Sequence, residues 1–276
     1  MDKPTKATKA EKITVKIDKE PETLASTLEM SEAIRTAPKN TNTYMPLSAG
    51  IESTAALIYA VKDPMMQPFC VHWYEARYGL FADAMAFYTR KQAEYFNLPY
   101  GNDKSMLTML PEMKDVPIIV SGLSAFMAVV IGQPGGFKLR YFMMGANAED
   151  DMRMKLQFRE YRKICATYLS DSLDGSGVRL ESIREVPQIM NPLDFLTKAE
   201  LYALIIRECP DMLDLIWTCF NPQGTLKTEG KITGYIPCGV CYKCTELSQA
   251  KKTAADAVYR LQEGEKYFSR ILKDMQ

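Results

Sequence analysis

The sequence predicts an α/β fold in which helices cover both faces of a parallel sheet. Apolar segments with strand character alternate with helical segments through the middle of the chain, and this alternation is typical of strands that helices connect. A chain of 276 residues is long enough for one large domain of this class with appendages. In such sheets the ligand binds beyond the carboxyl ends of the strands, where the strand order reverses.

The elements are predicted in the following order. A strand ending at Leu47 leads into a helix that is apolar on most faces, and later a loop leads into a helix that Thr197 and Glu200 are expected to cap. The predicted ranges are an edge strand at 13–17, a weak helix at 22–37, a helix at 53–62, a strand at 68–75, a helix at 81–97 with the stripe Phe81, Met85, Tyr88 and Tyr95, a strand or strand-to-helix entry at 116–122, a strand at 138–147, a loop and helix at 191–208, and a C-terminal helix to about 272 with Leu247, Ala254, Val258, Leu261 and Ile271 on one side.

Changes in composition divide the chain into four regions. The first is polar and rich in lysine and threonine, which is typical of disorder, and the last contains a cysteine-rich stretch. The predicted regions are a disordered tail (1–12), an N-terminal extension (13–40), an α/β nucleotide-binding domain (41–210), and a zinc-binding segment with the C-terminal helix (211–276).

Charge and composition disfavour several classes of partner. Acidic and basic residues number 34 each, so the chain has no net charge to attract a polyanion or an anionic membrane. No stretch approaches the roughly 18–20 apolar residues of a membrane span, and the lysine-dotted N-terminus is not a secretory signal. We therefore expect a cytoplasmic protein with no membrane partner, and the composition gives no strong signal for nucleic-acid binding.

The segment PLSAGIES (46–53), called the serine loop below, is the first candidate site. It lies where a buried strand turns into a helix, and such a turn offers backbone N–H groups and the positive end of the helix dipole to an anion. Small residues let the backbone approach phosphates, and hydroxyl groups donate to phosphate oxygens. Ser48, Ala49, Gly50, Ser53 and Thr54 supply this chemistry. An ordinary helix cap built from the same residue types is the alternative.

Four cysteines form the second candidate site. Cys219, Cys238, Cys241 and Cys244 follow the pattern C-x18-C-x2-C-x2-C, in which Gly239 permits a tight turn. Two C-x2-C steps and one upstream thiolate are typical of a tetrahedral zinc site with a structural role, and an iron–sulfur cluster is the alternative. The other cysteines, Cys70, Cys165 and Cys209, and the single histidine, His72, are expected to be buried core residues.

Together with two intermediate segments, these motifs resemble one family. SAGIEST is similar to the SGGxDST pyrophosphate loop of the PP-loop ATPases, although Ala49 and Glu52 replace a glycine and an aspartate, and Pro46 precedes the loop. A side chain at position 49 is harmless at negative φ and costly at positive φ. MMGANAEDD (143–151), NPLDFLTKAEL (191–201) and the W-x-C cysteine pattern extend the resemblance. From about residue 43 to 250 the chain resembles 7-cyano-7-deazaguanine synthase, a zinc-containing PP-loop ligase.

The resemblance implies a Rossmann-like fold of the HUP type and an ATP-dependent C–N ligase of the queuosine pathway that requires Mg²⁺ and Zn²⁺. ATP would adenylate the carboxylate of 7-carboxy-7-deazaguanine, ammonia would displace AMP to give an amide, and a second ATP would drive dehydration to the nitrile. The implied catalytic residues are Glu52, Asp150 and Lys198. The implied ATP-binding residues are Leu47, Ser48, Ala49, Gly50, Ile51, Glu52, Ser53, Thr54, Gly145 and Asn147.

Two departures from the family leave alternatives open. The family's Y-P-D-C-R run is absent, so Arg153 or Arg159 would have to replace it, and Leu247 stands where a basic residue is usual. The alternatives are a PP-loop ligase or sulfur-transfer enzyme acting on another substrate, and a scaffold protein that has lost ATP hydrolysis. For Lys198, the alternative to a role at the phosphate is that of a solvated lysine in the first turn of a helix. The expected assembly is a homodimer. If the protein is viral, its expected location is the host cytoplasm.

Overall fold

The computed structural model describes residues 30, 32–73, 78–103, 139–143, 145–150 and 187–274. Several sequence predictions lie outside these residues and stay predictions. They are the disordered tail (1–12), most of the extension (13–40), the strand at 116–122, and the residues Arg153, Arg159 and Cys165.

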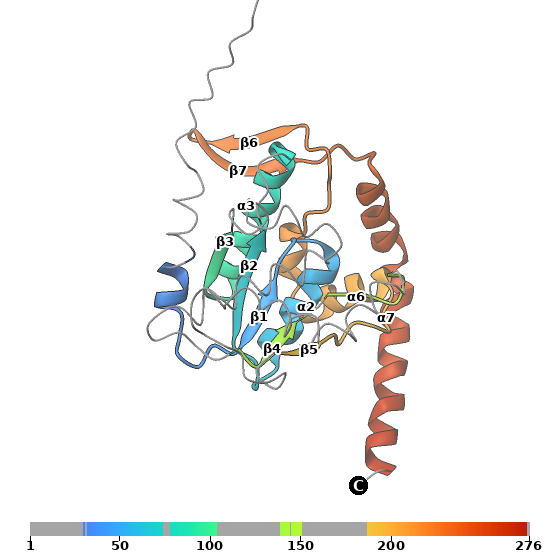
Figure 1. The fold of residues 1–276 in the computed structure, drawn as a ribbon. Coiled ribbons are helices and arrows are strands. Elements are labelled where there is room, and N and C mark those ends of the chain that lie inside the picture. Colours follow the sequence, from blue (N-terminus) through green and yellow to red (C-terminus); the bar gives the residue numbers. More distant parts are fainter. Residues whose placement is uncertain are drawn as a thin grey trace, which may run out of the picture.

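Within the described residues, five strands form a parallel sheet in the order β3-β2-β1-β4-β5 (Figure 1). All the neighbouring pairs run parallel, with Thr43 of β1 in register with Pro68 of β2 and with Tyr141 of β4. The strands are β1 Thr43–Pro46, β2 Pro68–Trp73, β3 Tyr100–Asp103, β4 Tyr141–Met143 and β5 Gln188–Met190. The predicted fold class, a parallel α/β sheet, is confirmed.

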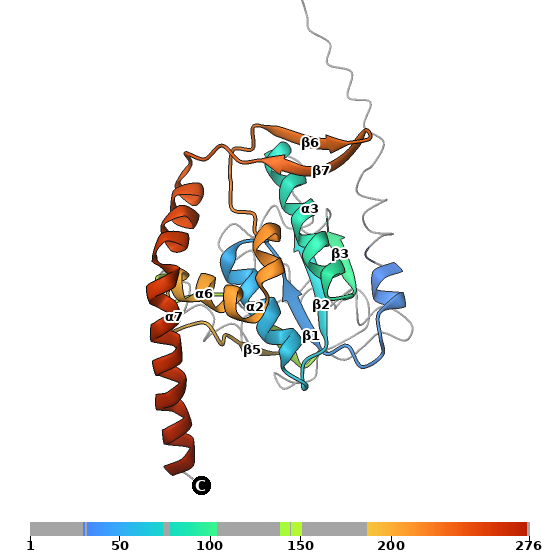
Figure 2. The same ribbon diagram turned by 180° about the vertical axis from the view of Figure 1, so that it is seen from behind.

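Helices connect the first strands in the right-handed sense. α2 (Ile51–Lys62) joins β1 to β2, and α3 (Leu80–Tyr95) joins β2 to β3. Because β1, β2 and β3 are neighbours in that order, right-handed crossovers place both helices on the same face of the sheet, and Figure 2 shows both in front of the strands. The next described strand, β4, lies on the other side of β1. The strand order therefore reverses at the carboxyl end of β1, where the serine loop begins.

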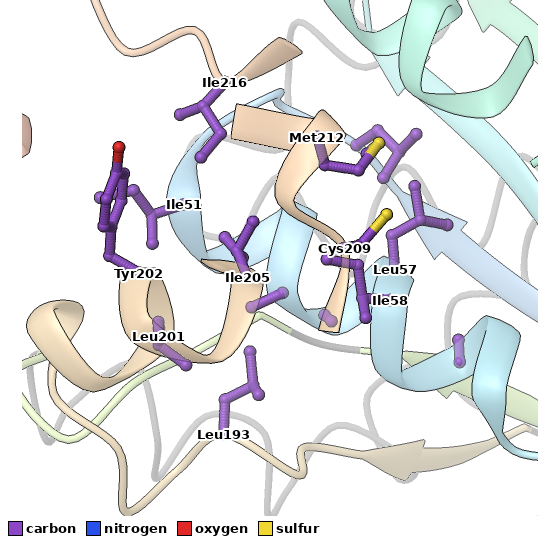
Figure 3. Close-up of a cluster of buried hydrophobic side chains, with 14 of the residues drawn as sticks. Ile51, Leu57, Ile58, Leu193, Leu201, Tyr202, Ile205, Cys209, Met212 and Ile216 are labelled. Atoms are coloured by element: carbon purple, nitrogen blue, oxygen red, sulfur yellow. The ribbon is translucent and has the colours of Figure 1, made fainter. Parts of the chain in front are cut away.

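The main hydrophobic core lies between α2 and α6 (Lys198–Glu208). Figure 3 shows Ile51, Leu57 and Ile58 of α2 beside Leu201 and Ile205 of α6. Both Leu57 and Leu201 have no exposed surface, and burial of a side chain of this size contributes about 1.5–3 kcal/mol. The prediction that the helix after the serine loop is buried on most faces is confirmed, since eight of its twelve residues are buried.

The start of α6 is fixed by the predicted capping box. Thr197 Oγ1 accepts from Glu200 N at 3.3 Å, and Glu200 Oε2 accepts from Thr197 N at 2.8 Å. The 3-10 helix η3 (Pro210–Leu215) follows α6. The C-terminal helix α7 (Tyr242–Asp274) runs beside α6 along one side of the molecule (Figures 1 and 2). None of the described helices combines the length and apolar character that a bilayer span requires.

The predicted apolar stripe of α3 is only partly buried. Tyr95 is 46% exposed, while the fully buried positions of the helix are small or polar: Ala82, Ala84, Thr89, Gln92 and Ala93. Small side chains let the helix approach its neighbours closely. The large residues Phe87 and Tyr88 instead contact Tyr235 and Trp217 of the C-terminal segment.

Two short strands and one hairpin were not predicted from the sequence. These are β3, β5 and the antiparallel hairpin of β6 (Gly224–Thr228) and β7 (Lys231–Ile236), which lies over one end of α3 (Figure 1). Its turn is made by Glu229 and Gly230, whose φ angles are +52° and +78°, as a type I′ hairpin requires. Tyr235 N donates to Tyr88 Oη at 3.3 Å and so ties the hairpin to α3.

Removal of a core side chain should destabilise this arrangement. Leu201→Ala leaves a cavity between α6 and α2, so we expect a loss of about 2–5 kcal/mol in the free energy of unfolding, measured by urea denaturation. Leu226→Ala is the matched control, because Leu226 is 51% exposed on β6. It should change the same quantity by no more than about 0.5 kcal/mol. Equal losses in the two variants would contradict the position of the core.

Candidate functional site

The serine loop is held in place by its own hydroxyl groups. Ser48 N donates to Ser53 Oγ at 3.3 Å, and the Oγ atoms of Ser48 and Ser53 lie 3.1 Å apart. Thr54 Oγ1 donates to Gly50 O at 2.7 Å and accepts from Gln92 Nε2 at 2.8 Å. The N-cap of α2 is Gly50, which receives no side-chain cap. The two serines therefore brace the turn and do not form the ordinary helix cap considered above.

Ala49 adopts the backbone conformation in which a side chain is costly. Its φ is +57°, in the left-handed region, where an L-residue loses about 1 kcal/mol relative to glycine. The carbonyl of Ala49 accepts a hydrogen bond from Trp217 N at 2.8 Å. This bond joins the serine loop to the segment that carries the first of the four cysteines.

The segment 145–150 packs directly against the first turn of α2. A Cβ at Gly145 would lie 2.9 Å from the backbone carbon of Glu52, so only glycine fits there without a shift. Asn147 is fully buried and its Nδ2 donates to Glu52 Oε1 at 3.2 Å. Asp150 Oδ2 accepts from Asn147 N at 2.7 Å, which closes the turn. Gly145 thus packs against the backbone of Glu52, and Asn147 holds its carboxylate by a hydrogen bond.

Two lysines and two glutamates form a network of ion pairs beside the serine loop. Lys198 Nζ lies 2.6 Å from Glu246 Oε1 and 3.6 Å from Glu52 Oε1, and Lys243 Nζ donates to Glu246 Oε2 at 3.0 Å. Burial opposes the charge of Lys198, but the carboxylates of Glu246 and Glu52 outweigh it and raise the pKa of this amine. The side chain of Lys198 is only 16% exposed, so it is not a solvated lysine.

These groups line one pocket at the carboxyl end of β1. Four predicted ATP-binding residues line it: Ser48, Gly50, Ile51 and Glu52. The predicted catalytic residue Lys198 lines it as well. The remaining lining residues, which the sequence reading did not assign to a binding site, are Phe81, Met85, Trp217, Thr218, Phe220, Lys243, Glu246 and Leu247.

The other predicted residues lie behind this lining. Leu47 and Thr54 are buried, and both make hydrogen bonds within the fold. Asn147 and Asp150 belong to the supporting turn described above, and the assignment of Asp150 as a catalytic residue stays a prediction. No local sequence pattern predicts that the aromatic and charged residues between 217 and 247 line this pocket. Their position depends on a tertiary contact, the hydrogen bond from Trp217 N to Ala49 O.

The four predicted cysteine ligands come together. The Sγ atoms of Cys219, Cys238, Cys241 and Cys244 all lie within 4.8 Å of one another, and the group could hold a metal ion. A tetrahedral ion with metal–sulfur bonds of about 2.3 Å separates its thiolates by about 3.8 Å, so these positions fit a single ion. Gly239 has φ +74°, which confirms the predicted tight turn between the second and third cysteines.

Backbone N–H groups favour the thiolate state of Cys238 and Cys241, whereas burial raises the pKa of Cys219 and Cys244. Cys238 N donates to Cys219 Sγ at 3.2 Å, and Cys241 N donates to Cys238 Sγ at 3.3 Å. Burial raises the pKa of Cys241, but donors from the backbone of Cys244 and Phe220 outweigh this and lower it to about 6. Metal ions bind the thiolate, so such donors favour binding.

The remaining cysteines and the histidine of the described residues are buried, as predicted. Cys70 and Cys209 lie in the core, and burial raises the pKa of the Cys70 thiol well above its usual range. His72 Nδ1 lies 3.0 Å from the Leu47 carbonyl, and burial lowers the pKa of this imidazole to about 4. His72 is therefore neutral and supports the start of the serine loop.

Comparison with known proteins gives only distant structural likeness. No protein-family model and no curated protein sequence matches the chain. A U34-tRNA thiolase NcsA from Methanococcus maripaludis, solved with its [4Fe-4S] cluster, is 15% identical with a TM-score of 0.38, over 91% of this chain and 80% of that one. An NMN synthetase from Francisella tularensis is 14% identical with a TM-score of 0.34, over 70% and 72%. An NH₃-dependent NAD synthetase from Campylobacter jejuni is 13% identical with a TM-score of 0.34, over 70% and 75%. At these values the likeness assigns no activity.

The close approach at Gly145 generates a stability prediction. Gly145→Ala forces the 145–150 turn away from the first turn of α2, so we expect a loss of about 1–3 kcal/mol in the free energy of unfolding. The matched control is Gly224→Ala, because a Cβ there would meet its nearest atom, Ile236 Cδ1, at 3.8 Å. Urea denaturation of both variants measures the difference, and an unaffected Gly145→Ala protein would contradict the packing.

Proposed function

We propose that the protein is an ATP-dependent ligase of the PP-loop type, which adenylates a carboxylate and releases pyrophosphate. The observation that carries this proposal is the pocket in which the serine loop and Lys198 meet at the carboxyl end of the central strand. A strand-to-helix turn with small residues suits a pyrophosphate, because its backbone N–H groups and the helix dipole favour an anion. The lysine adds a charge that strengthens hydrogen bonds to phosphate.

The residues of the pocket would share the work of binding and orientation. Ser48 and Gly50 would contact the phosphates, and Lys198 would neutralise charge that develops on the leaving pyrophosphate. Glu52, a carboxylate that lines the pocket, fits Mg²⁺, which prefers oxygen ligands and is usually held by one or two carboxylates with phosphates. Bound Mg²⁺ would supply further charge neutralisation at the phosphates. Asn147 would keep Glu52 in place by its 3.2 Å hydrogen bond.

For the carboxylate we propose 7-carboxy-7-deazaguanine, with ammonia as the second substrate. This choice rests on the sequence resemblance. The aromatic lining supports it, because Phe81, Trp217 and Phe220 offer faces and edges to a planar ring. AMP is a good leaving group, and ammonia can displace it where it cannot attack a free carboxylate. The product would be the amide, and after a second ATP the nitrile.

For the four cysteines we propose a structural zinc ion. Four thiolates close the coordination sphere and leave no position for a substrate, so the ion would stabilise the fold. The sulfur separations, all within 4.8 Å, support a single ion over an iron–sulfur cluster, because the thiolates of a four-iron cluster stand further apart.

Three features of the site favour a second function, that of a scaffold protein without ATP hydrolysis. Ala49, at φ +57°, and the longer side chain of Glu52 both depart from the pyrophosphate loop that the segment resembles. In addition, both glutamates of the pocket are paired with lysines. A scaffold would retain the fold and the metal but bind no nucleotide.

Metal analysis tests the zinc proposal. The purified protein should contain about one zinc per chain by mass spectrometry, and Cys241→Ser should lower both the zinc content and the melting temperature. Cys70→Ala is the control, because Cys70 is a cysteine outside the cluster and should leave the zinc content unchanged. A folded, colourless preparation without metal would refute the structural role, and iron in a brown preparation would establish the cluster alternative.

An assay of AMP and product tests the ligase proposal. The protein is incubated with ATP, Mg²⁺, ammonia and 7-carboxy-7-deazaguanine, and AMP and the base are followed together by mass spectrometry. We expect AMP with amide or nitrile from the wild-type chain, and a loss of AMP of about a hundredfold or more from Glu52→Ala. The control is Glu94→Ala, since the side chain of Glu94 is 53% exposed on α3.

Each other outcome has a defined meaning. AMP without a modified base would keep the adenylating activity and assign it to another substrate. No AMP from folded, zinc-loaded protein would make the scaffold the better proposal. An unchanged rate in Glu52→Ala would mean that ATP is not split at the serine loop.

A further inference from the structure

We propose that Lys243 is a second phosphate-binding cation of the pocket, and that Glu246 is the positioning residue that holds it there together with Lys198. This inference rests on the proposed nucleotide function and adds two residues that the sequence motifs do not assign. It follows from the contacts at the first turns of α7.

Lys243 lines the pocket and belongs to α7, a different helix from α2 and α6. It belongs to the first turn of α7 and stands between two of the cysteines, Cys241 and Cys244. Its side chain is 30% exposed and lines the same pocket as Ser48 and Gly50. The ammonium group can therefore reach the pocket without being fully solvated.

A single carboxylate holds both lysines. Glu246 Oε1 lies 2.6 Å from Lys198 Nζ, and Glu246 Oε2 accepts from Lys243 Nζ at 3.0 Å. Glu246 thus bridges two cations that come from different helices.

The charges of the pocket balance when it holds no ligand. Its two lysines, Lys198 and Lys243, face two carboxylates, Glu52 and Glu246. A phosphate group is a stronger partner for an ammonium ion than a shared carboxylate, because it offers more oxygen atoms and more charge. An entering di- or triphosphate would therefore replace Glu246 as the acceptor of Lys243, while Glu246 keeps both side chains in the pocket beforehand.

The wall of the pocket also contains a buried donor. Trp217 lines the pocket and is 5% exposed, and its Nε1–H has no hydrogen-bond partner among the described residues. A buried donor without an acceptor costs about 1–3 kcal/mol.

The cysteine segment fixes the backbone of Lys243 relative to the serine loop. Thr218 Oγ1 donates to Lys243 O at 3.2 Å, and the neighbouring Trp217 N donates to Ala49 O at 2.8 Å. Residues 217–219 therefore connect the loop, Lys243 and the first cysteine over three consecutive positions. Cys241 and Cys244 on either side of Lys243 would strengthen this connection when they hold an ion.

Calorimetric titration of the full, zinc-loaded chain with inorganic pyrophosphate and with MgATP tests the inference. Loss of one charged hydrogen bond weakens binding about tenfold, so Lys243→Ala should raise both dissociation constants by about that factor. Lys243→Arg keeps the charge and should stay within about threefold of the wild type. The matched control is Lys252→Ala, an exposed lysine on the same helix, which should bind like the wild type.

Glu246→Gln separates positioning from general stability. This variant keeps the shape of the side chain but removes the charge that holds the two lysines, so we expect pyrophosphate to bind about threefold more weakly, with zinc content and melting temperature unchanged. A merely structural role of Glu246 would instead lower the melting temperature and leave binding by the folded protein unchanged, and equal or tighter binding at an unchanged melting temperature would refute the positioning role.

The outcomes distinguish this inference from the function on which it rests. If the wild-type chain binds neither ligand, the nucleotide proposal fails and this one fails with it. If the wild type binds and Lys243→Ala binds equally well, only the role of Lys243 is refuted. If Lys243→Ala loses zinc, Lys243→Met, which keeps the aliphatic stem, is titrated in its place under the same criterion.

Discussion

The hydrogen bond from Trp217 N to Ala49 O is the contact on which the candidate site depends. The serine loop alone is a turn at the carboxyl end of the central strand β1 and is not a closed pocket. This bond brings the segment before the cysteines onto the loop, and Trp217, Thr218 and Phe220 then form the opposite wall of the pocket. Two stretches that lie far apart in the sequence thus become one site, and neither of them is a complete site by itself.

Packing around Trp217 keeps this contact rigid. The indole ring stacks on the ring of Tyr88 in α3, with 5.0 Å between the ring centroids and 7° between the ring planes. Tyr235 of the hairpin packs against both rings. Stacked aromatic pairs contribute about 0.5–1.5 kcal/mol beyond the area that they bury. α3 is itself fixed to the loop helix by the bond between Gln92 and Thr54. The hairpin, α3 and the loop therefore form one connected support for the pocket.

Local patterns in the sequence were sufficient for the parts of the structure that depend on neighbouring residues. The capping box of Thr197, the buried helix after the serine loop and the four converging cysteines all follow from spacing within short segments. β3 and β5 were missed because strands of four and three residues are too short for periodicity to show. The far wall of the pocket was missed for a different reason. It depends on tertiary contacts of Trp217 and Glu246, which no local pattern encodes.

The departure at Ala49 can be weighed by its energetics. The left-handed conformation costs an alanine about 1 kcal/mol relative to glycine. Its methyl group, however, is completely buried in a cluster with Ala84, Trp217 and Tyr235, and burial of one such group contributes about 0.8 kcal/mol. The two effects nearly cancel, so alanine is tolerated here because the cysteine segment covers the loop. An alanine at this position is therefore compatible with the fold, and it is weak support for a loop that has lost its function.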